Sequence, residues 1–185
     1  MLNLLINNLA KELDKLGIPY MIIDGQAVLL YGEPRLTRDV DITLGITPES
    51  LDKVLQVVKN LGLNVLVENA EKFVKQTWVL PVYDEKPGFR VDFMFSWTPY
   101  EKEALRRVKE INIEGYPVKF ASPEDVIIHK VIAGRAKDLE DVKSIIRKQA
   151  NLDVNLIRKW LTSFSDVLNK DLWAQFESLF REKAE

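Results

Sequence analysis

Two short apolar segments with acids at alternating positions constrain the fold more than any other feature. Residues 39–44 read Asp-Val-Asp-Ile-Thr-Leu, and residues 90–95 read Arg-Val-Asp-Phe-Met-Phe. Side chains of a strand point alternately to opposite faces, so Asp39 and Asp41 share one face while the apolar residues pack on the other. Asp92 repeats this arrangement in the second segment. The pattern predicts two central strands, and three converging carboxylates if those strands are neighbours.

Converging carboxylates repel one another unless a cation lies between them. Three of them suit one or two Mg²⁺ or Mn²⁺ ions, which prefer oxygen ligands and bridge phosphate oxygens. The chain has no cysteine and one histidine, His129, which excludes thiolate sites and histidine cages. The Asp-x-Asp spacing alone is more typical of solvated residues at the end of a sheet. The third acid and the upstream segment favour a metal site.

The remaining sequence predicts an α+β fold, with a mixed central sheet flanked by helices and a helical C-terminal region. Its 185 residues, 46% hydrophobic, suffice for one core with a helical appendage. We expect residues 1–121 to form the α/β core and residues 122–185 to pack on it as part of one structural unit. The predicted strands are 20–23, 39–44, 63–68, 77–83 and 89–95, with a hairpin of 110–114 and 116–120. The predicted helices are 2–16, 27–31, 47–61, a short one after 98, 122 to about 147, 153–159 and 171–180.

The charge and hydropathy of the chain limit its partners. A formal net charge of −2 provides no global basic field of the kind that holds long nucleic acids, which favours a small or locally bound substrate. No uninterrupted apolar run approaches the roughly 20 residues needed to span a bilayer, and the N-terminus has no cleavage-like site. We expect a cytoplasmic protein with no membrane partner.

A strand-to-helix turn precedes the first acidic strand. The apolar segment 20–23 runs into Asp24, Gly25 and Gln26, and a short helix follows. Backbone N–H groups at such a helix start can face an anion. A single glycine here is weak support, since most glycines in such turns supply a positive φ.

Residues 22–42 together resemble the signature of the DNA polymerase β-like nucleotidyltransferase superfamily, and within it the branch of AbiEii-type toxins and minimal nucleotidyltransferases. Arg35, Thr37, Asp39 and Asp41 match the run Arg-x-Thr-x-Asp-x-Asp of that branch. The resemblance implies that Asp39, Asp41 and Asp92 are catalytic and hold Mg²⁺ or Mn²⁺. It implies substrate binding by the turn and the signature residues Gly25, Gln26, Arg35 and Thr37. Gln26 stands where the superfamily usually has Gly or Ser.

A second segment resembles another signature of the same branch, Lys-x-x-Ala-x-Arg-x-Lys-Asp-x-x-Asp, in residues 130–141. The resemblance implies that Lys130, Arg135, Lys137 and Asp138 also bind substrate.

Taken as one helix, residues 122 to about 147 place Arg135 inside an apolar stripe. Burying a guanidinium is costly without an anionic partner. We therefore expect Arg135 to be buried and paired. Its partner is a structural acid such as Asp138 or Asp125, or else a triphosphate or the acidic cluster at the sheet. The same helix places Lys130 and Lys137 on the opposite face, where their charges would be solvated unless they bind phosphate.

The resulting hypothesis is a metal-dependent, nucleotide- and ATP-binding transferase that moves a nucleoside monophosphate from an NTP to a hydroxyl of RNA, protein or a small molecule. The resemblance to toxin–antitoxin proteins implies tRNA as one acceptor and a cognate antitoxin as one partner. The alternative is a non-catalytic nucleotide- or partner-binding module, favoured by Gln26. A weaker alternative is a metal-dependent phosphohydrolase.

Overall fold

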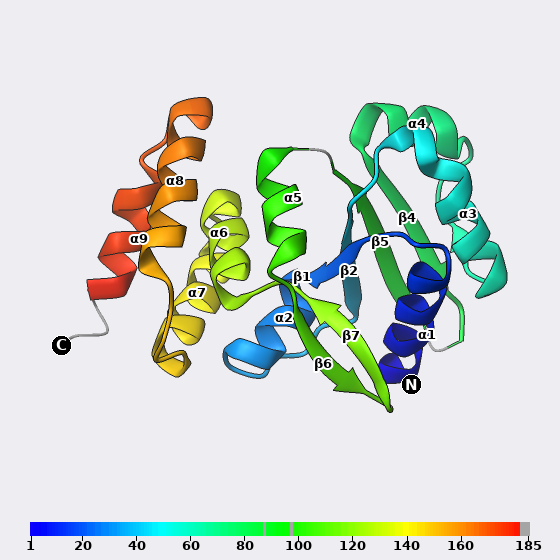
Figure 1. Cartoon of the computed structure of the whole chain (residues 1–185), viewed down its shortest axis with the longest axis horizontal. Helices are drawn as coiled ribbons and strands as arrows, with labels where there is room; N and C mark the ends of the chain where they lie inside the picture. The colour runs from blue at the N-terminus through cyan, green and yellow to red at the C-terminus, as the bar shows by residue number, and fades with distance from the viewer. Residues whose placement is uncertain (87, 97, 182–185) are drawn as a thin grey trace. The chain divides into compact units, whose positions relative to one another are not determined.

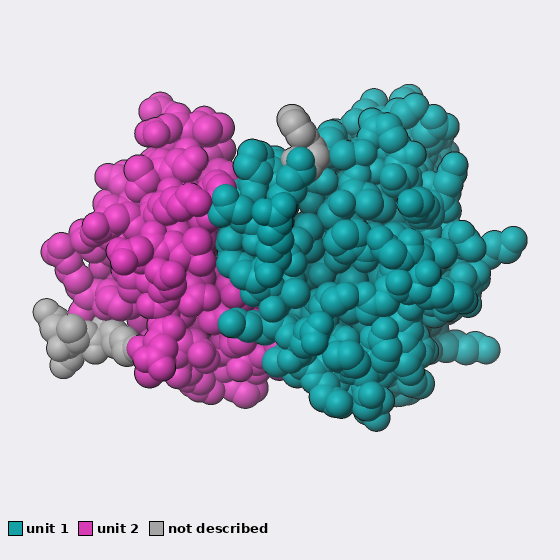
Figure 2. All heavy atoms as spheres, in the orientation of Figure 1, with its two compact units in different colours: residues 1–26, 37–120 teal, residues 27–36, 121–185 magenta. Residues whose placement is uncertain are grey.

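The computed structural model describes residues 1–86, 88–96 and 98–181. Its internal contacts define two compact units, which Figure 2 colours separately. Unit 1 comprises Met1–Gln26 and Thr37–Phe120, and unit 2 comprises Ala27–Leu36 and Ala121–Glu185. The predicted division into residues 1–121 and 122–185 stays a prediction. The last residues of the second region, 182–185, lie outside the described part of the chain.

Unit 1 is built on a seven-stranded mixed sheet of the described residues, in the order β3-β4-β5-β2-β1-β7-β6. Figure 1 labels all of these strands except β3. The strands are β1 Tyr20–Ile23, β2 Asp39–Leu44, β3 Asn64–Val65, β4 Val79–Asp84, β5 Phe89–Phe95, β6 Lys109–Ile113 and β7 Tyr116–Phe120. β2 pairs with β5, and β1 with β7, in parallel, whereas the other pairs are antiparallel. The α+β prediction is therefore confirmed.

The centre of this sheet follows from the alternation in its two acidic strands. Val40 and Ile42 of β2, and Val91 and Phe93 of β5, are fully buried, as expected for the apolar face. The helices around the sheet are α1 Leu2–Lys15, the short 3-10 helix η1 Pro48–Ser50, α3 Leu51–Asn60, α4 Ala70–Thr77 and α5 Pro99–Arg106. α1 contacts α3 and the β6–β7 hairpin, and α4 contacts β4.

The segment between α3 and β4 differs from its prediction. The strand expected over 63–68 shrinks to Asn64–Val65, and an unpredicted helix, α4, follows it. Asn69 caps that helix by accepting a hydrogen bond from the Lys72 N–H. An Asn cap before a polar stretch is a recognisable helix start, although the surrounding sequence has little apolar periodicity.

In its described residues, unit 2 consists of most of α2, the segment 32–36 that follows it and four further helices. α2 (Asp24–Tyr31) starts in unit 1 and enters unit 2 after Gln26. The other helices are α6 Pro123–Ala133, α7 Ala136–Lys148, α8 Val154–Leu168 and α9 Leu172–Arg181. α6 contacts α7, α8 and α9, and their shared core includes Ile127, Val131, Ile145 and Phe176.

The single helix predicted from 122 to about 147 is wrong, because the chain breaks into α6 and α7. Gly134 adopts φ 64°, a left-handed conformation, and its N–H bonds to the Lys130 carbonyl. Arg135 is extended and forms the N-cap position of α7. Glycine with positive φ is a common helix end, so the sequence contained this signal.

Hydrogen bonds fix the segment 27–36 to the helices of unit 2. The Glu33 N–H donates to Ser144 Oγ at 3.1 Å, and Lys148 Nζ donates to the Gly32 carbonyl at 3.1 Å. The loop leading toward β2 is therefore held by α7.

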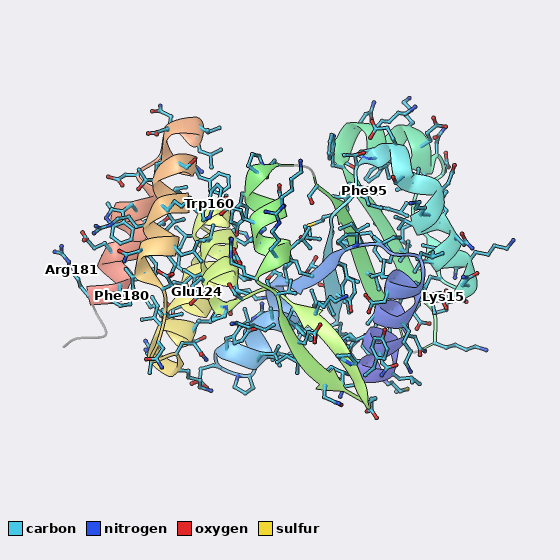
Figure 3. All side chains as sticks on the ribbon, in the orientation of Figure 1. Lys15, Phe95, Glu124, Trp160, Phe180 and Arg181 are labelled. Atoms are coloured by element: carbon cyan, nitrogen blue, oxygen red, sulfur yellow. The ribbon has the colours of Figure 1, made fainter. Side chains whose placement is uncertain are left out.

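A further hydrogen bond lies within the helical region: the Asp153 N–H donates to the buried Glu124 carboxylate at 3.1 Å (Figure 3 labels Glu124).

None of the helices in the described part of the chain has the length and apolar character needed to cross a membrane.

Candidate active site

β2 and β5 bring two of the three predicted catalytic acids into register. Asp41 pairs with Asp92, and Asp39 pairs with Arg90, across the parallel ladder. Neighbouring strands lie about 4.8 Å apart, and residues in register point to the same face. Asp41 and Asp92 are half-buried and Asp39 is exposed. Unit 1 thus presents three acids on one face of its two central strands.

Arg90 is a cation at this site that the sequence analysis did not single out. Its Nε donates to both carboxylate oxygens of Asp92, each at 3.0 Å. The hydrogen bond to Asp92 raises the pKa of Arg90; burial opposes the shift, and the charges of Asp92, Asp39 and Asp41 add to it. One guanidinium therefore interacts with three carboxylates. The available signal was its position two residues before Asp92, on the same face of the strand.

The three carboxylates provide a donor set that fits Mg²⁺ or Mn²⁺, because these ions prefer oxygen ligands from acidic side chains. Among the described residues, however, Asp39, Asp41 and Asp92 are not a group whose ligand oxygens all lie within 4.8 Å of one another. Their joint metal binding stays a prediction.

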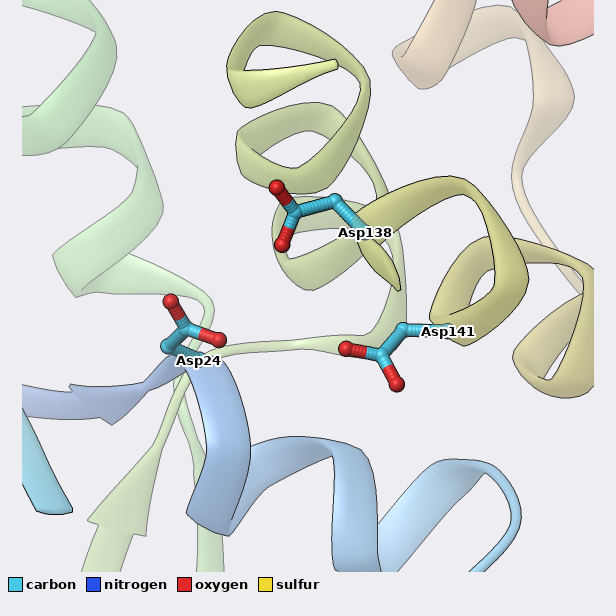
Figure 4. A group of neighbouring side chains, drawn as sticks. All are labelled: Asp24, Asp138 and Asp141. Carbon is cyan, nitrogen blue, oxygen red and sulfur yellow. The ribbon is translucent and has the colours of Figure 1, made fainter. Parts of the chain in front are cut away.

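The turn at the end of β1 lies beside Asp41, because Ile23 pairs with Asp41 in the antiparallel β1–β2 ladder. α2 starts at Asp24, three residues earlier than predicted. Asp24 has φ 52°, an uncommon conformation for a residue other than glycine. Such conformations cost about 1–3 kcal/mol and concentrate at functional sites. The sequence analysis did not single out Asp24, which is visible at the start of α2 in Figure 4.

A glycine is required at position 25 because the Thr37 side chain lies close to it. Its backbone conformation is not the reason, since its φ is not positive. A Cβ atom there would lie 2.6 Å from Thr37 Oγ1, well inside van der Waals contact. The Gly25 turn and Thr37 of the first signature therefore touch each other within unit 1.

Gln26 uses its side chain to connect the turn to β2. Its Nε2 donates to the Asp39 carbonyl at 3.2 Å, and the residue is 6% exposed. The amide is therefore held against the backbone of the acidic strand.

The second signature forms an ion network within unit 2 whose lysine and two aspartates are buried. Lys130 Nζ lies 2.9 Å from Asp138 Oδ1 and 3.0 Å from Asp141 Oδ2. Arg35 donates to both oxygens of Asp141 at 3.0 and 3.1 Å, and Arg135 donates to both oxygens of Asp138 at 2.6 and 3.2 Å. Figure 4 shows the Asp138 and Asp141 side chains on α7. Arg35 of the first signature is thus paired with an acid of the second.

Comparison with known families assigns the chain. Residues 1–184 match the family described as nucleotidyltransferase of unknown function, DUF6036. The chain belongs to this family. No curated protein matches it.

Solved structures share the fold of this chain. A solution structure of the antibiotic-resistance factor ANT(2'')-Ia has a TM-score of 0.63 at 20% identity, covering 90% of this chain and 94% of that chain. A crystal structure of ANT(2'')-Ia in complex with adenylyl-2''-tobramycin has a TM-score of 0.61 at 20% identity, covering 95% and 97%. An antigenic nucleotidyltransferase-like protein from Paracoccidioides brasiliensis has a TM-score of 0.59 at 19% identity, covering 95% and 92%. At these identities the likeness concerns the fold.

Two expectations about the second signature of the DUF6036 chain are wrong. Arg135 is not buried: its side chain is 71% exposed, although it pairs with Asp138 as one alternative proposed. Lys130 is not solvated: its side chain is 3% exposed. The error for Arg135 comes from extending one helical wheel across the break at Gly134. Lys130 lies before the break, on α6, which is buried on most of its sides. Lys137 is exposed on α7.

The network shifts the protonation of Asp138 in the DUF6036 chain. Burial tends to raise the pKa of Asp138, but hydrogen bonds from Arg135 and Lys130, with their charges, outweigh it and hold the pKa below its ordinary value. Asp138 is therefore a stable anion at neutral pH. Substrate binding by Lys130, Arg135, Lys137 and Asp138 stays a prediction.

Proposed function

We propose that this protein transfers a nucleoside monophosphate from an NTP to a hydroxyl group, in a reaction that depends on Mg²⁺ or Mn²⁺ held by Asp39, Asp41 and Asp92. The observation that supports this most is the register of Asp41 with Asp92 on adjacent parallel strands, with Asp39 on the same face. Membership of a nucleotidyltransferase family supports the reaction class.

The residues of unit 1 have separate tasks in this reaction. Asp39 and Asp41 provide carboxylate ligands, and backbone N–H groups at the start of α2, beside Gly25, face the phosphates. Asp39, Asp41 and Asp92 would hold a divalent ion there, which would supply Lewis-acid stabilisation of the negative charge in the reaction. The acceptor oxygen bonds to the α-phosphorus, the bond from that phosphorus to the bridging oxygen breaks, and pyrophosphate leaves. Asp92 accepts the proton of the acceptor hydroxyl.

The Gln26 contact supports catalysis over a non-catalytic module. A side chain pointing into the turn would obstruct the phosphates, but the Gln26 amide is buried and bonded to the Asp39 carbonyl. In this geometry the turn stays open and Gln26 holds the strand that carries Asp39. Gln26→Gly should therefore lower turnover, whereas an obstructing side chain predicts that turnover rises.

The acceptor belongs to one of three classes: RNA, with tRNA as its main candidate, a protein, or a small hydroxylated molecule. The adenylyl-2''-tobramycin complex of a protein with the same fold supports the small-molecule class. A cognate antitoxin is a further candidate partner, from the AbiEii resemblance.

Incubation with each α-³²P-labelled NTP, with Mg²⁺ or Mn²⁺, tests the proposal, using total tRNA, the protein itself and an aminoglycoside as acceptors. We expect one labelled product from the parent, lost in EDTA and reduced at least about 100-fold in Asp41→Asn. Asp52→Asn, which changes an exposed acid on α3, is the matched control and should label like the parent. Metal-dependent NTP binding with no product for any acceptor would favour the non-catalytic module. Release of nucleotide or phosphate without an acceptor would indicate a phosphohydrolase.

A further inference from the structure

The Asp92 carboxylate shares one face of the sheet with two other carboxylates and with the Arg90 guanidinium. Three carboxylates of one sheet face interact with the Arg90 guanidinium, whose Nε bonds to both Asp92 oxygens at 3.0 Å. The Asp92 side chain is 20% exposed and the Arg90 side chain is 50% exposed. The Asp92 oxygens that a metal ion would need are thus already bonded to a flexible, half-exposed side chain.

We propose that Arg90 is a positioning residue that holds Asp92 while no divalent ion is bound and must release it when one binds, so that Arg90 sets the metal affinity of the site. This inference rests on the proposed function. It is independent of which NTP or acceptor the enzyme uses.

Two physical terms make this exchange possible. Breaking a half-exposed ion pair costs little, because water solvates both partners. A guanidinium that stayed beside Asp92 would instead repel a divalent ion a few ångströms away strongly enough to weaken its binding about tenfold. The Arg90 side chain can move into solvent, whereas Asp92 is fixed on a central strand. Arg90 is therefore the group that yields.

Arg90 also limits the repulsion among the acids before the ion arrives. Its guanidinium lies within electrostatic reach of Asp39, Asp41 and Asp92. Without the Arg90 charge, the three carboxylates on this face of two adjacent strands would repel one another more strongly. Arg90 thus stabilises the metal-free protein and weakens the first metal-binding step.

Mn²⁺ titration of the full chain without nucleotide, followed by calorimetry and by the electron paramagnetic resonance signal of free Mn²⁺, tests this role. We expect Arg90→Gln to bind Mn²⁺ about tenfold more tightly than the parent. Arg90→Lys keeps the charge without the guanidinium and should lie between the two. Arg106→Gln, which removes an exposed arginine of α5, is the charge-matched control and should stay within about twofold of the parent.

Unchanged or weaker Mn²⁺ binding in Arg90→Gln would overturn the inference while leaving the metal site intact. Thermal unfolding provides a second readout: metal-free Arg90→Gln should unfold at a lower temperature than the parent, and Mn²⁺ should raise that temperature more than in the parent. If Arg90→Gln does not fold, Arg90→Lys decides by the same titration. Asp41→Asn separates the two proposals. Mn²⁺ binding that survives Asp41→Asn unchanged would overturn the proposed metal site itself.

Discussion

Both units of this protein gather acidic side chains, but they compensate the charges differently. In unit 1, the Arg90 guanidinium lies within electrostatic reach of Asp39, Asp41 and Asp92, and the group is partly open to solvent. In unit 2, two carboxylates, Asp138 and Asp141, are paired with three cations, and the exposure of the Asp138 side chain is 1%. The first group has an excess of negative charge, and the second has none.

This difference supports separate roles for the two groups of acids. Buried charges are tolerated where partners and hydrogen bonds satisfy them, and removing one partner leaves the others uncompensated. Carboxylates that share one partly exposed face are stabilised by a bound cation. We therefore propose that the acids of unit 1 act in catalysis and that the network of unit 2 supports the fold.

Removal of Lys130 has the largest expected effect on stability. Lys130→Met leaves Asp138 and Asp141 buried without their shared cation, and should lower the free energy of unfolding by about 3–5 kcal/mol. Urea unfolding measures it. Lys137→Met changes an exposed lysine of the same signature and should stay within about 0.5 kcal/mol of the parent.

This expectation differs from the role in substrate binding that the sequence resemblance implies for Lys130. A Lys130→Met protein as stable as the parent but unable to bind NTP would restore the role of phosphate ligand. It would also break the contrast between the two units.

The sequence predicted the two acidic strands well because the pattern that identifies a strand lies within the strand itself. Alternation with a period of two residues fixes which side chains of β2 and β5 face the core, and both strands contain β-branched or aromatic residues on that face. The sequence predicted that the three carboxylates converge if the strands are neighbours, and the β2–β5 ladder places Asp41 opposite Asp92. Arg90 was equally readable, because residues 90 and 92 must share a face.

The network of unit 2 was less predictable because its partners are distant in sequence. Arg35 meets Asp141 more than 100 residues later in the chain, at an N–O distance of 3.0 Å. A helical wheel contains no information about such a contact. The break at Gly134 was accessible from the glycine itself, and ignoring it moved Arg135 from an exposed N-cap position to an apparent core position.

Acid should weaken the network of unit 2 through Asp138. The pKa of this carboxyl is lowered in the folded protein: burial opposes the shift, and the bonds from Arg135 and Lys130 outweigh it. A lowered pKa adds stability that is present above the unfolded value of about 3.9 and is lost as the pH falls through the folded value. The destabilisation by Asp138→Asn, measured by urea unfolding, should therefore be larger at pH 7 than at pH 3. A destabilisation independent of pH would show that the Asp138 charge contributes nothing to the network.

Neutralising Asp39 should have the smallest effect on stability, with the opposite sign. Asp39 is exposed, and Asp39→Asn removes one charge from a group that already has an excess of carboxylates. We expect a free energy of unfolding unchanged or raised by up to about 0.5 kcal/mol. Mn²⁺ affinity should fall at least about tenfold, because the ion loses a ligand. Urea unfolding and Mn²⁺ titration of one preparation give both numbers, with Asp52→Asn on α3 as the control for losing one exposed carboxylate. A strong loss of stability in Asp39→Asn would mean that unit 1, like unit 2, uses its acids to hold the fold, and the contrast between the two groups of charges would disappear.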